Sequence, residues 1–359
     1  MDPTRRSLTG TGGYVKVGRK GNAKWNFSET FTWSSPGFDL NDMGYMKETD
    51  YLMNETEIMY RQTDIWKIFR YNAFTLSQKN MWNYGGTPFS NNASLRWQSM
   101  TMNRYEWDVK ETFAWNWLDS RLLRGGPDVR FGSYFLTSAK FNTDKAKRMM
   151  FMLKYEGDHN FEGNRFNTIS PSLTFRLGNH VYLSGQLDYA WNTDEMQYVA
   201  TTSPLSSSSL APYYYVMGHM DQKTYGLTLK LQVNVTPDIS IQFYGAPFTS
   251  IAKYDDFKLA ADTKSHTFEN RFQRIDPDQL TYADGVYTIG EGAGQMPFRN
   301  PDFRFNEFRS NLVAAGNTCP VPRFISYGNT GCLTGTTGTP PAGEVIWIVC
   351  GDSPLQIRS

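Results

Sequence analysis

Few side chains of this chain are spaced as a catalytic or metal centre would require. The four histidines are scattered and show no metal-ligand spacing: they are His159, His180, His219 and His266. The three cysteines fit no zinc pattern: they are Cys319, Cys332 and Cys350. No glycine-rich phosphate loop and no Gly-x-Ser-x-Gly elbow occurs. The sequence therefore assigns no catalytic, cofactor-binding or metal-binding residue, and it predicts a function other than catalysis.

Three short segments would suit a ligand, but each has a simpler interpretation. Residues 123–127, Leu-Arg-Gly-Gly-Pro, would suit an anion-binding nest, although a tight turn has the same composition. The acidic groups at 255–256 and 276–278 would suit Ca²⁺, or are solvated loop charges. Residues 213–215, Tyr-Tyr-Tyr, would stack on a sugar ring, or would pack in a loop or at a membrane interface. We favour the interpretation without a ligand for all three.

Composition excludes some partners and leaves a membrane open. The chain has 359 residues with 36 Lys+Arg against 35 Asp+Glu, and this balance argues against a nucleic-acid partner. The mean hydropathy is −0.53, and no stretch approaches the ~18 consecutive apolar residues of a transmembrane helix. Transmembrane strands are half polar, so neither fact excludes them. Aromatic residues make up 15% of the chain, as the aromatic girdles of outer-membrane barrels would require.

The segment 223–235 has two chemically opposite faces. Alternate residues are apolar: they are Tyr225, Leu227, Leu229, Leu231, Val233 and Val235. The residues between them are polar or small: they are Thr224, Gly226, Thr228, Lys230, Gln232 and Asn234. Because successive side chains leave opposite faces of a strand, this period predicts a β-strand. The run is longer than the ~5–6 residues usual for soluble strands and suits a tilted strand crossing a bilayer, which needs about 9–11.

The same alternation recurs along the chain. It is clear at 24–33, 105–117, 148–156, 166–177, 180–192 and 238–243, and weaker at 51–61, 67–82, 92–103 and 130–140. In one of these strands Trp107 and Trp115 would stand about 20 Å apart along the membrane normal, close to an apolar band of ~25 Å. The pattern predicts an all-β fold, an antiparallel transmembrane β-barrel. A soluble β-sandwich is the alternative that would also alternate.

The connecting segments differ in length. Tight turns are expected at 177–180 and 236–238, where Gly, Asn, Pro and Asp gather. Long loops are expected at 194–222 and 245–304. Short turns on one side and long loops on the other are typical of outer-membrane barrels.

Two carboxylates conflict with a lipid-facing row. Glu29 and Glu111 each lie in the middle of the apolar face of a predicted strand. A carboxylate is unfavourable at mid-bilayer, although less so than the ~2–4 kcal/mol of Arg or Lys. Three solutions stay open: the groups are neutral, are paired on a neighbouring strand, or are turned inward by a bulge.

The last part of the chain has a different texture. Alternation stops after 308–313, and Gly, Thr and Pro are frequent at 317–343. All three cysteines lie in this last part, within 314–359. One interpretation is a disordered extension. Another is a frameshift from about residue 314, because a shifted frame permits Trp-Glu-Tyr, then Pro-Gly-Ser-Thr and an aromatic-rich strand. We therefore expect 1–313 to be a partial barrel domain and 314–359 an irregular tail, out of frame.

Several longer phrases resemble a known family. They are Ser-Pro-Gly-Phe-Asp-Leu-Asn-Asp-Met-Gly-Tyr at 35–45, Leu-Arg-Gly-Gly-Pro at 123–127, Tyr-Gly-Ala-Pro-Phe at 244–248 and Asn-Pro-Asp-Phe-Arg-Phe-Asn-Glu-Phe-Arg-Ser-Asn-Leu at 300–312. From about residue 5 to 313 the chain resembles the C-terminal domain of unknown function of Gram-negative envelope proteins that follows a signal peptide and a carbohydrate-binding family 9-like module. The resemblance implies an outer-membrane β-barrel with a link to glycans. Because the start lacks an apolar signal-peptide core, we expect the chain to begin within a longer protein.

These observations lead to one functional expectation with two alternatives. We expect a non-enzymatic pore, scaffold or surface anchor in the cell outer membrane, incomplete at both ends. Its expected partners are outer-membrane lipid and, through the resemblance, a glycan; no cofactor and no nucleic acid are expected. The alternatives are a carbohydrate-binding surface protein that acts through long loops and a soluble β-rich glycan-processing enzyme.

Overall fold

The chain folds almost entirely into β-strands. The computed structural model describes residues 9–39, 46, 48–115, 117–178, 180–204, 213–316, 324–329 and 345–348. The helical elements within these ranges are single turns, η2 (Glu269–Arg271), η3 (Pro277–Gln279) and η4 (Gly292–Gly294). None of the described helices is long and apolar enough to span a membrane. The all-β prediction is therefore confirmed.

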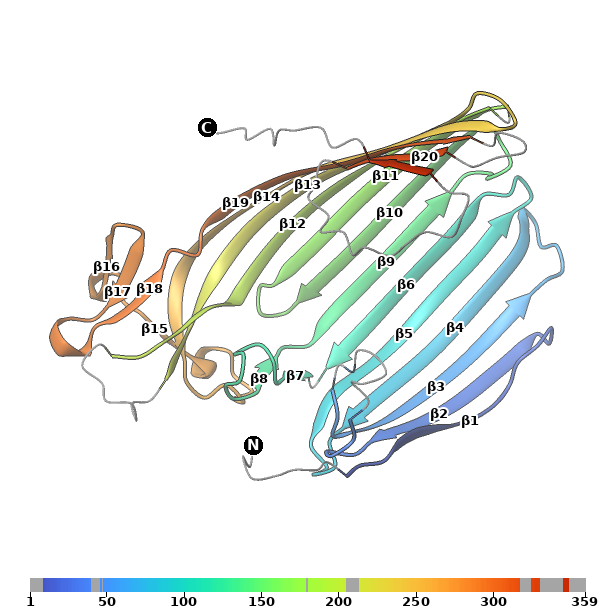
Figure 1. Cartoon of the computed structure of the whole chain (residues 1–359). Helices are drawn as coiled ribbons and strands as arrows, with labels where there is room; N and C mark the ends of the chain where they lie inside the picture. The colour runs from blue at the N-terminus through green and yellow to red at the C-terminus, as the bar shows by residue number, and fades with distance from the viewer. Residues whose placement is uncertain are drawn as a thin grey trace.

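One sheet of 16 strands dominates the molecule (Figure 1). Its path is β1 (Gly12–Arg19), β2 (Trp25–Ser34), β3 (Tyr51–Gln62), β4 (Phe69–Trp82), β5 (Pro88–Thr101), β6 (Glu106–Trp115), β9 (Tyr134–Asn142), β10 (Met149–Asn160), β11 (Arg165–Leu177), β12 (Val181–Thr202), β13 (Tyr214–Asn234), β14 (Ile239–Ala260), β19 (Phe303–Gly316), β20 (Phe324–Asn329) and β21 (Val345–Ile348), with β15 (Phe272–Arg274) beside the end of β14. Every pair is antiparallel except β20 with β21. The two small sheets are β7 (Trp117–Asp119) with β8 (Val129–Phe131), and β16 (Leu280–Ala283), β17 (Val286–Ile289) and β18 (Met296–Arg299).

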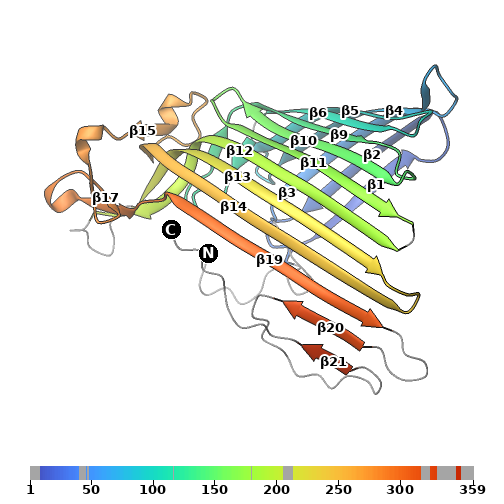
Figure 2. The ribbon, with the colours of Figure 1, turned by 90° about the horizontal axis from the view of Figure 1, so that it is seen from above.

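The main sheet curves into a trough (Figure 2). Among the described residues the path runs from β1 to β21 and no pairing joins these two ends, so the sheet is not a closed barrel. The antiparallel order follows the chain closely, because nearly every strand pairs with the next long strand in sequence. This arrangement needs only hairpin connections.

The two ends of the sheet differ in their connections. At one end, here called the turn end, only short turns join the strands: they are 20–24, 63–68, 102–105, 143–148, 178–180 and 235–238. The other end carries the longer segments 35–50, 116–133, 203–213 and 261–302, together with the short turns 83–87 and 161–164. The longest connections thus lie at one end, as predicted, and the two predicted turns at 177–180 and 236–238 lie at the turn end.

The predicted long loops are wrong in their bounds. Much of 194–222 is strand, since β12 runs to Thr202 and β13 begins at Tyr214. The start of the predicted loop 245–304 is likewise the second half of β14, which ends at Ala260. These three strands extend past the end of β11, which pairs with β12 only up to Thr193.

The extended halves of β12, β13 and β14 carry a small cap. It consists of these halves with β7, β8 and β15–β18, at one end of the sheet (Figure 1). Two clusters of buried apolar side chains lie there: they are Leu123, Val129, Met196, Met217 and Phe272, and Val216, Phe257, Leu259, Ile289 and Phe298. The cap therefore has a water-excluding core of its own.

A buried arginine of the cap connects β8 with the turn 161–164. The side chain of Arg271 is 1% exposed and forms an ion pair with Glu162, with Nη2–Oε1 at 2.7 Å. It also donates to the backbone carbonyls of Arg130 at 2.8 Å and Ser265 at 2.7 Å. A buried charge is tolerated only when it is paired and hydrogen-bonded, and Arg271 meets this condition.

The segment 314–359 is described only in part. Residues 314–316 continue β19, and β20 and β21 lie at the edge of the sheet. The three cysteines and most of the residues that motivated the frameshift hypothesis lie outside the described residues. The out-of-frame origin of this segment stays a prediction.

Candidate functional site: a sheet with one apolar and one polar face

The two faces of the main sheet differ in chemistry and in exposure. In β2, Trp25 and Phe27 are 60% and 52% exposed, whereas Asn26 and Ser28 between them are 7% and 5% exposed. The pattern repeats along the sheet: buried polar residues include Thr75, Ser94, Thr112, Ser170, Thr174 and Ser250. We call the two sides the apolar face and the polar face. Because small buried side chains crowd the polar face, it corresponds to the inside of the curved sheet, and the apolar face is the outside.

Aromatic residues form two rows on the apolar face. The row near the turn end contains Trp25–Tyr60, Trp107–Phe141 and Phe141–Phe151, with ring centroids 4.9, 4.4 and 6.5 Å apart. The row near the cap contains Phe113–Phe135, Phe135–Phe161 and Tyr189–Tyr225, at 5.0, 5.9 and 5.0 Å. Cross-strand pairing places these residues side by side, although they are far apart in sequence.

Aliphatic residues lie between the aromatic rows from β3 to β5, and on β11–β14 and β19 they lie on the turn-end side of the row near the cap. They include Ile58, Leu76, Leu95, Leu173, Leu183, Leu187, Leu229, Ile241 and Leu312, all among the exposed large hydrophobic residues. Register confirms that they form a continuous surface: Ile58 pairs with Leu76, and Leu76 with Leu95. Leu183 is in turn paired with Leu231. This exposed apolar belt crosses the sheet from β3 to β19.

The polar face holds a network of charged and hydroxyl side chains. Arg96 donates through Nε to Asp108 Oδ1 at 2.7 Å, and Gln98 donates to the same carboxylate at 3.2 Å. Farther along the sheet, Ser170 and Gln186 donate to Asp188 Oδ1 at 2.6 and 2.9 Å. Most of these charges therefore have partners across neighbouring strands, which fixes the strands relative to one another.

Glu29 and Glu111 each have a hydrogen-bond partner on a neighbouring strand. Glu29 accepts a hydrogen bond from the side-chain amide of Asn54 on β3, and Glu111 accepts one from the Thr137 hydroxyl at 2.7 Å. Each glutamate therefore has a partner on a neighbouring strand, which is one of the three predicted solutions. Both glutamates remain on the apolar face: Glu29 pairs in register with Thr56, between Phe27 and Phe31.

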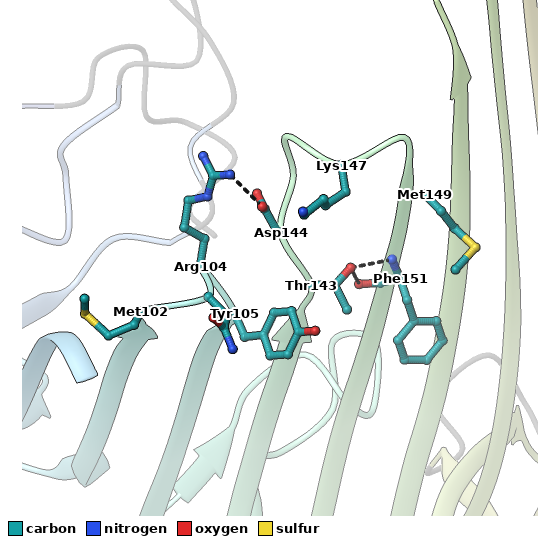
Figure 3. A pocket seen from close by; sticks show the side chains of 9 residues that line it. Met102, Arg104, Tyr105, Thr143, Asp144, Lys147, Met149 and Phe151 are labelled. Carbon is teal, nitrogen blue, oxygen red and sulfur yellow. Dashed lines mark hydrogen bonds and ion pairs between the residues drawn. The ribbon is translucent and has the colours of Figure 1, made fainter. Parts of the chain in front are cut away.

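A first cavity lies at the turn end (Figure 3). It measures about 470 Å³ and lies between the turns 102–105 and 143–148. Arg104 points across it to Asp144, with Nη2–Oδ2 at 2.8 Å, and the carboxylate of Asp144 is nearly buried. Because Arg104 is neutralised by Asp144 and Lys147 is the other lining cation, this ion pair links the two turns and leaves one lysine facing the cavity.

A second cavity lies on the apolar face, just above the aromatic row near the cap. It measures about 500 Å³, and its lining residues come from β12, β13 and β14: they are Trp191, Asn192, Thr193, His219, Asp221, Gln222, Lys223, Tyr225, Ile251, Lys253 and Asp255. We call it the Trp191 pocket. Sequence reasoning did not find it, because its residues are separated in the chain and meet only through the registers Trp191↔Lys223 and Lys223↔Ile251.

A histidine at the upper edge of the Trp191 pocket is held by acids. His219 Nδ1 lies 3.1 Å from Glu195 and its Nε2 lies 3.6 Å from Asp221. Burial tends to lower the pKa of His219, but the hydrogen bond and charge of Glu195, together with Asp255 and Asp221, outweigh it and raise the pKa above 6.5. Burial also raises the pKa of the neighbouring Asp194 carboxyl.

The structure shows what surrounds the segments that the sequence suggested as ligand sites: residues 123–127, the acidic pair 255–256 and the tyrosines at 213–215. Residues 123–127 form a turn closed by Gly126 N to Leu123 O at 3.1 Å, with Leu123 buried in the cap core. Asp256 lies 3.3 Å from Lys258, and no described group of three or more His, Cys, Asp and Glu side chains could hold a metal ion. Tyr214 and Tyr215 pack against the two cap clusters.

Comparison with known proteins identifies the family. The model of a domain of unknown function, DUF5916, matches residues 3–282, and the chain therefore belongs to this family. No curated protein and no solved structure matches the chain significantly. The family description names no activity, so the expected link to carbohydrate-binding modules and to the outer membrane stays a prediction.

Proposed function

We propose that this member of the DUF5916 family forms the wall of an outer-membrane β-barrel and serves there as a non-enzymatic pore, scaffold or surface anchor. The observation that carries the proposal is the exposed apolar belt, bounded by the aromatic row near the cap and, on β2–β10, by a second aromatic row near the turn end. In water-soluble proteins contiguous exposed apolar patches rarely exceed a few hundred Å². A band of aliphatic residues flanked by aromatic girdles is typical of the lipid-facing side of transmembrane barrels.

The energy at stake supports a lipid environment. Covering one half-exposed leucine or isoleucine is worth about 1 kcal/mol. The nine aliphatic residues of the belt would then contribute about 9 kcal/mol, which is within the about 5–15 kcal/mol net stability of a typical domain. A sheet that left this belt in water would forgo about as much free energy as the entire net stability of a typical domain.

The ends of the sheet and its polar face agree with this orientation. The turn end and the opposite end, which carries the longest segments, would correspond to the periplasmic and extracellular sides of such barrels. The polar face, with Arg96 and Asp108, would line the interior, as it does in barrels that enclose water. In hydrocarbon an open sheet edge does not occur, so the proposed barrel needs a further strand beside β1, which pairs only with β2 among the described strands.

Cysteine labelling of neighbouring residues on opposite faces tests the proposal. In a background in which Cys319, Cys332 and Cys350 are serine, Leu229→Cys faces the belt and Lys230→Cys faces the polar side of the same strand. A charged, water-soluble maleimide should label Lys230→Cys in intact membranes and leave Leu229→Cys unlabelled. Leu229 is 39% exposed in the protein itself, so its own neighbours leave it open to the label and lipid would account for its protection.

Two further measurements complete the test. Both cysteines should label equally after the protein is unfolded in denaturant, which controls for reactivity. The protein should fractionate with the outer membrane and show a heat-dependent gel shift in mild detergent. Equal labelling of both positions in intact cells, or recovery of the folded protein in the soluble fraction, would refute membrane insertion.

A further inference from the structure

The Trp191 pocket changes character from its lower to its upper edge. Its lowest residue is Tyr225, which belongs to the aromatic row, and Trp191 lies one step above it. Lys223 lies level with Trp191, Lys253 lies opposite Asp221 one step higher, and His219 with Asp255 lies at the top. The pocket is therefore aromatic at its lower edge, carries its two lysines in the middle and ends in imidazole and acid.

The two lysines of this pocket are available to a ligand. Lys223 and Lys253 are exposed, and among the described residues neither forms an ion pair or a side-chain hydrogen bond. Arg304 is paired in register with Ile251 and adds a third exposed cation at the same level. By contrast, Arg104 in the turn-end cavity is already neutralised by Asp144.

Asp221 lies opposite Lys253 in register, but its side-chain contacts are with Thr193 and His219. Asp221 accepts from the Thr193 hydroxyl at 2.8 Å and lies within 3.6 Å of His219. Asp255 pairs in register with His219, and Nδ1 of His219 lies 3.1 Å from Glu195. Carboxylates held in this way suit sugar hydroxyls as donors, whereas the free lysines suit an anionic group.

We propose that the Trp191 pocket binds the phosphorylated sugar headgroup of a membrane lipid. The aromatic rings of Trp191 and Tyr225 would stack on the sugar, Lys223 and Lys253 would hold its phosphate, and the acids of the pocket would accept hydrogen bonds from its hydroxyls. A phosphosugar in solution has the same chemistry. The position of the pocket directly above the apolar belt favours the lipid, because acyl chains would continue down over Leu187 and Leu227.

This inference rests on the proposed function only for the source of the ligand. The site itself is tested with the detergent-solubilised full chain, so its result does not depend on insertion into a bilayer. The probes are lipid A, which is a phosphorylated disaccharide lipid, its dephosphorylated form, and glucose 1-phosphate in solution. Binding constants are measured by native mass spectrometry.

The decisive variant is Lys223→Gln combined with Lys253→Gln. Because a basic residue near an anionic lipid surface contributes about fivefold in affinity, the double variant should bind lipid A about 25-fold more weakly than the unaltered chain. The matched control is Lys79→Gln with Lys230→Gln, which removes two lysines from the polar face and should leave affinity unchanged. Trp191→Ala should weaken both forms of lipid A alike, since stacking does not need the phosphate.

Three results would overturn parts of the inference. Equal affinity for lipid A and its dephosphorylated form, or an unchanged constant in the lysine double variant, would refute the phosphosugar site. Glucose 1-phosphate binding as tightly as lipid A, with the same loss in the double variant, would confirm the site and refute a lipid as its source. Insertion into neutral phosphatidylcholine vesicles is measured separately, and its failure would count against the proposed barrel alone.

Discussion

Replacing Leu187 by arginine distinguishes a lipid-facing belt from a water-exposed one. Leu187 is 56% exposed on the apolar face and pairs with Leu227. From Val181 to Trp191 the strand rises about 33 Å, or about 25 Å along the normal at a ~40° tilt. Leu187 would then lie about 15 Å above Val181 and about 10 Å below Trp191, close to the midplane.

The two environments predict different costs. At the bilayer midplane an arginine costs about 2–4 kcal/mol, whereas near the interface it costs about 0–1 kcal/mol. A substitution at a half-exposed position in water usually changes stability by no more than about 0.5 kcal/mol. We therefore expect Leu187→Arg to lose about 3 kcal/mol, and Leu177→Arg, which lies beside the turn 178–180, to lose less than about 1 kcal/mol.

Guanidinium unfolding in phosphatidylcholine vesicles, carried out on the barrel completed by the further strand beside β1, measures this difference. With a denaturant slope of about 4 kcal/mol/M, a loss of 3 kcal/mol lowers the midpoint by about 0.75 M. Gln186→Arg is the matched control, because Gln186 neighbours Leu187 but lies on the polar face, where it donates to Asp188. If Leu187→Arg and Gln186→Arg lower the midpoint equally, or if Leu177→Arg costs as much as Leu187→Arg, the assignment of the apolar face to lipid is wrong.

Three further predictions concern charged groups. Arg271→Met should lower the stability of the cap by about 3–5 kcal/mol, because it leaves the Glu162 carboxylate and several carbonyls unpaired. Hydrogen exchange of the cap amides measures this loss. The double variant Arg271→Met with Glu162→Gln should recover part of the lost stability. The pKa of His219 is raised in the folded chain, so its contribution to cap stability is complete below about pH 6.5 and is lost as the pH rises through the raised value; this slope should vanish in His219→Gln, and an unchanged slope would exclude His219 as its source. Glu29→Gln should stabilise the chain in vesicles by about 1 kcal/mol, because a neutral amide costs less in hydrocarbon than a carboxylate, and a destabilised variant would contradict this.

The strands of the sheet could be predicted because each of their faces meets a single environment. Where one side is apolar and the other polar, as in β2 and in the first half of β12, every second residue reports its face. The cap could not be predicted in this way. Met196, Val216 and Met217 are fully buried, and Val216 and Met217 are consecutive, so both faces of the extended strands are covered and the alternation disappears. Because the alternation is missing there, the sequence predicts a loop for these residues.

The candidate site depends on register, which a single sequence leaves open. Trp191, Lys223 and Ile251 are far apart in the chain, and a shift of one residue in either pairing would place Lys223 beside Ala190 or Ala252 on the other face. The turns 178–180 and 235–238 fix these registers, and they were recognised in the sequence. What could not be foreseen is that the strands continue far enough past the aromatic row to bring the lysines together.

The length of three strands explains why the cap exists. β12, β13 and β14 contain 22, 21 and 22 residues, about twice the 9–11 that a tilted strand needs to cross a bilayer. On the proposed function the excess half of each strand lies in water, where a narrow ribbon is only marginally stable without a core. The clusters around Met217 and Val216 and the buried Arg271 supply that core. Because the cap holds the extended strands in place, it also fixes the upper edge of the Trp191 pocket, and loosening the cap through Arg271→Met should weaken lipid A binding while the belt remains inserted.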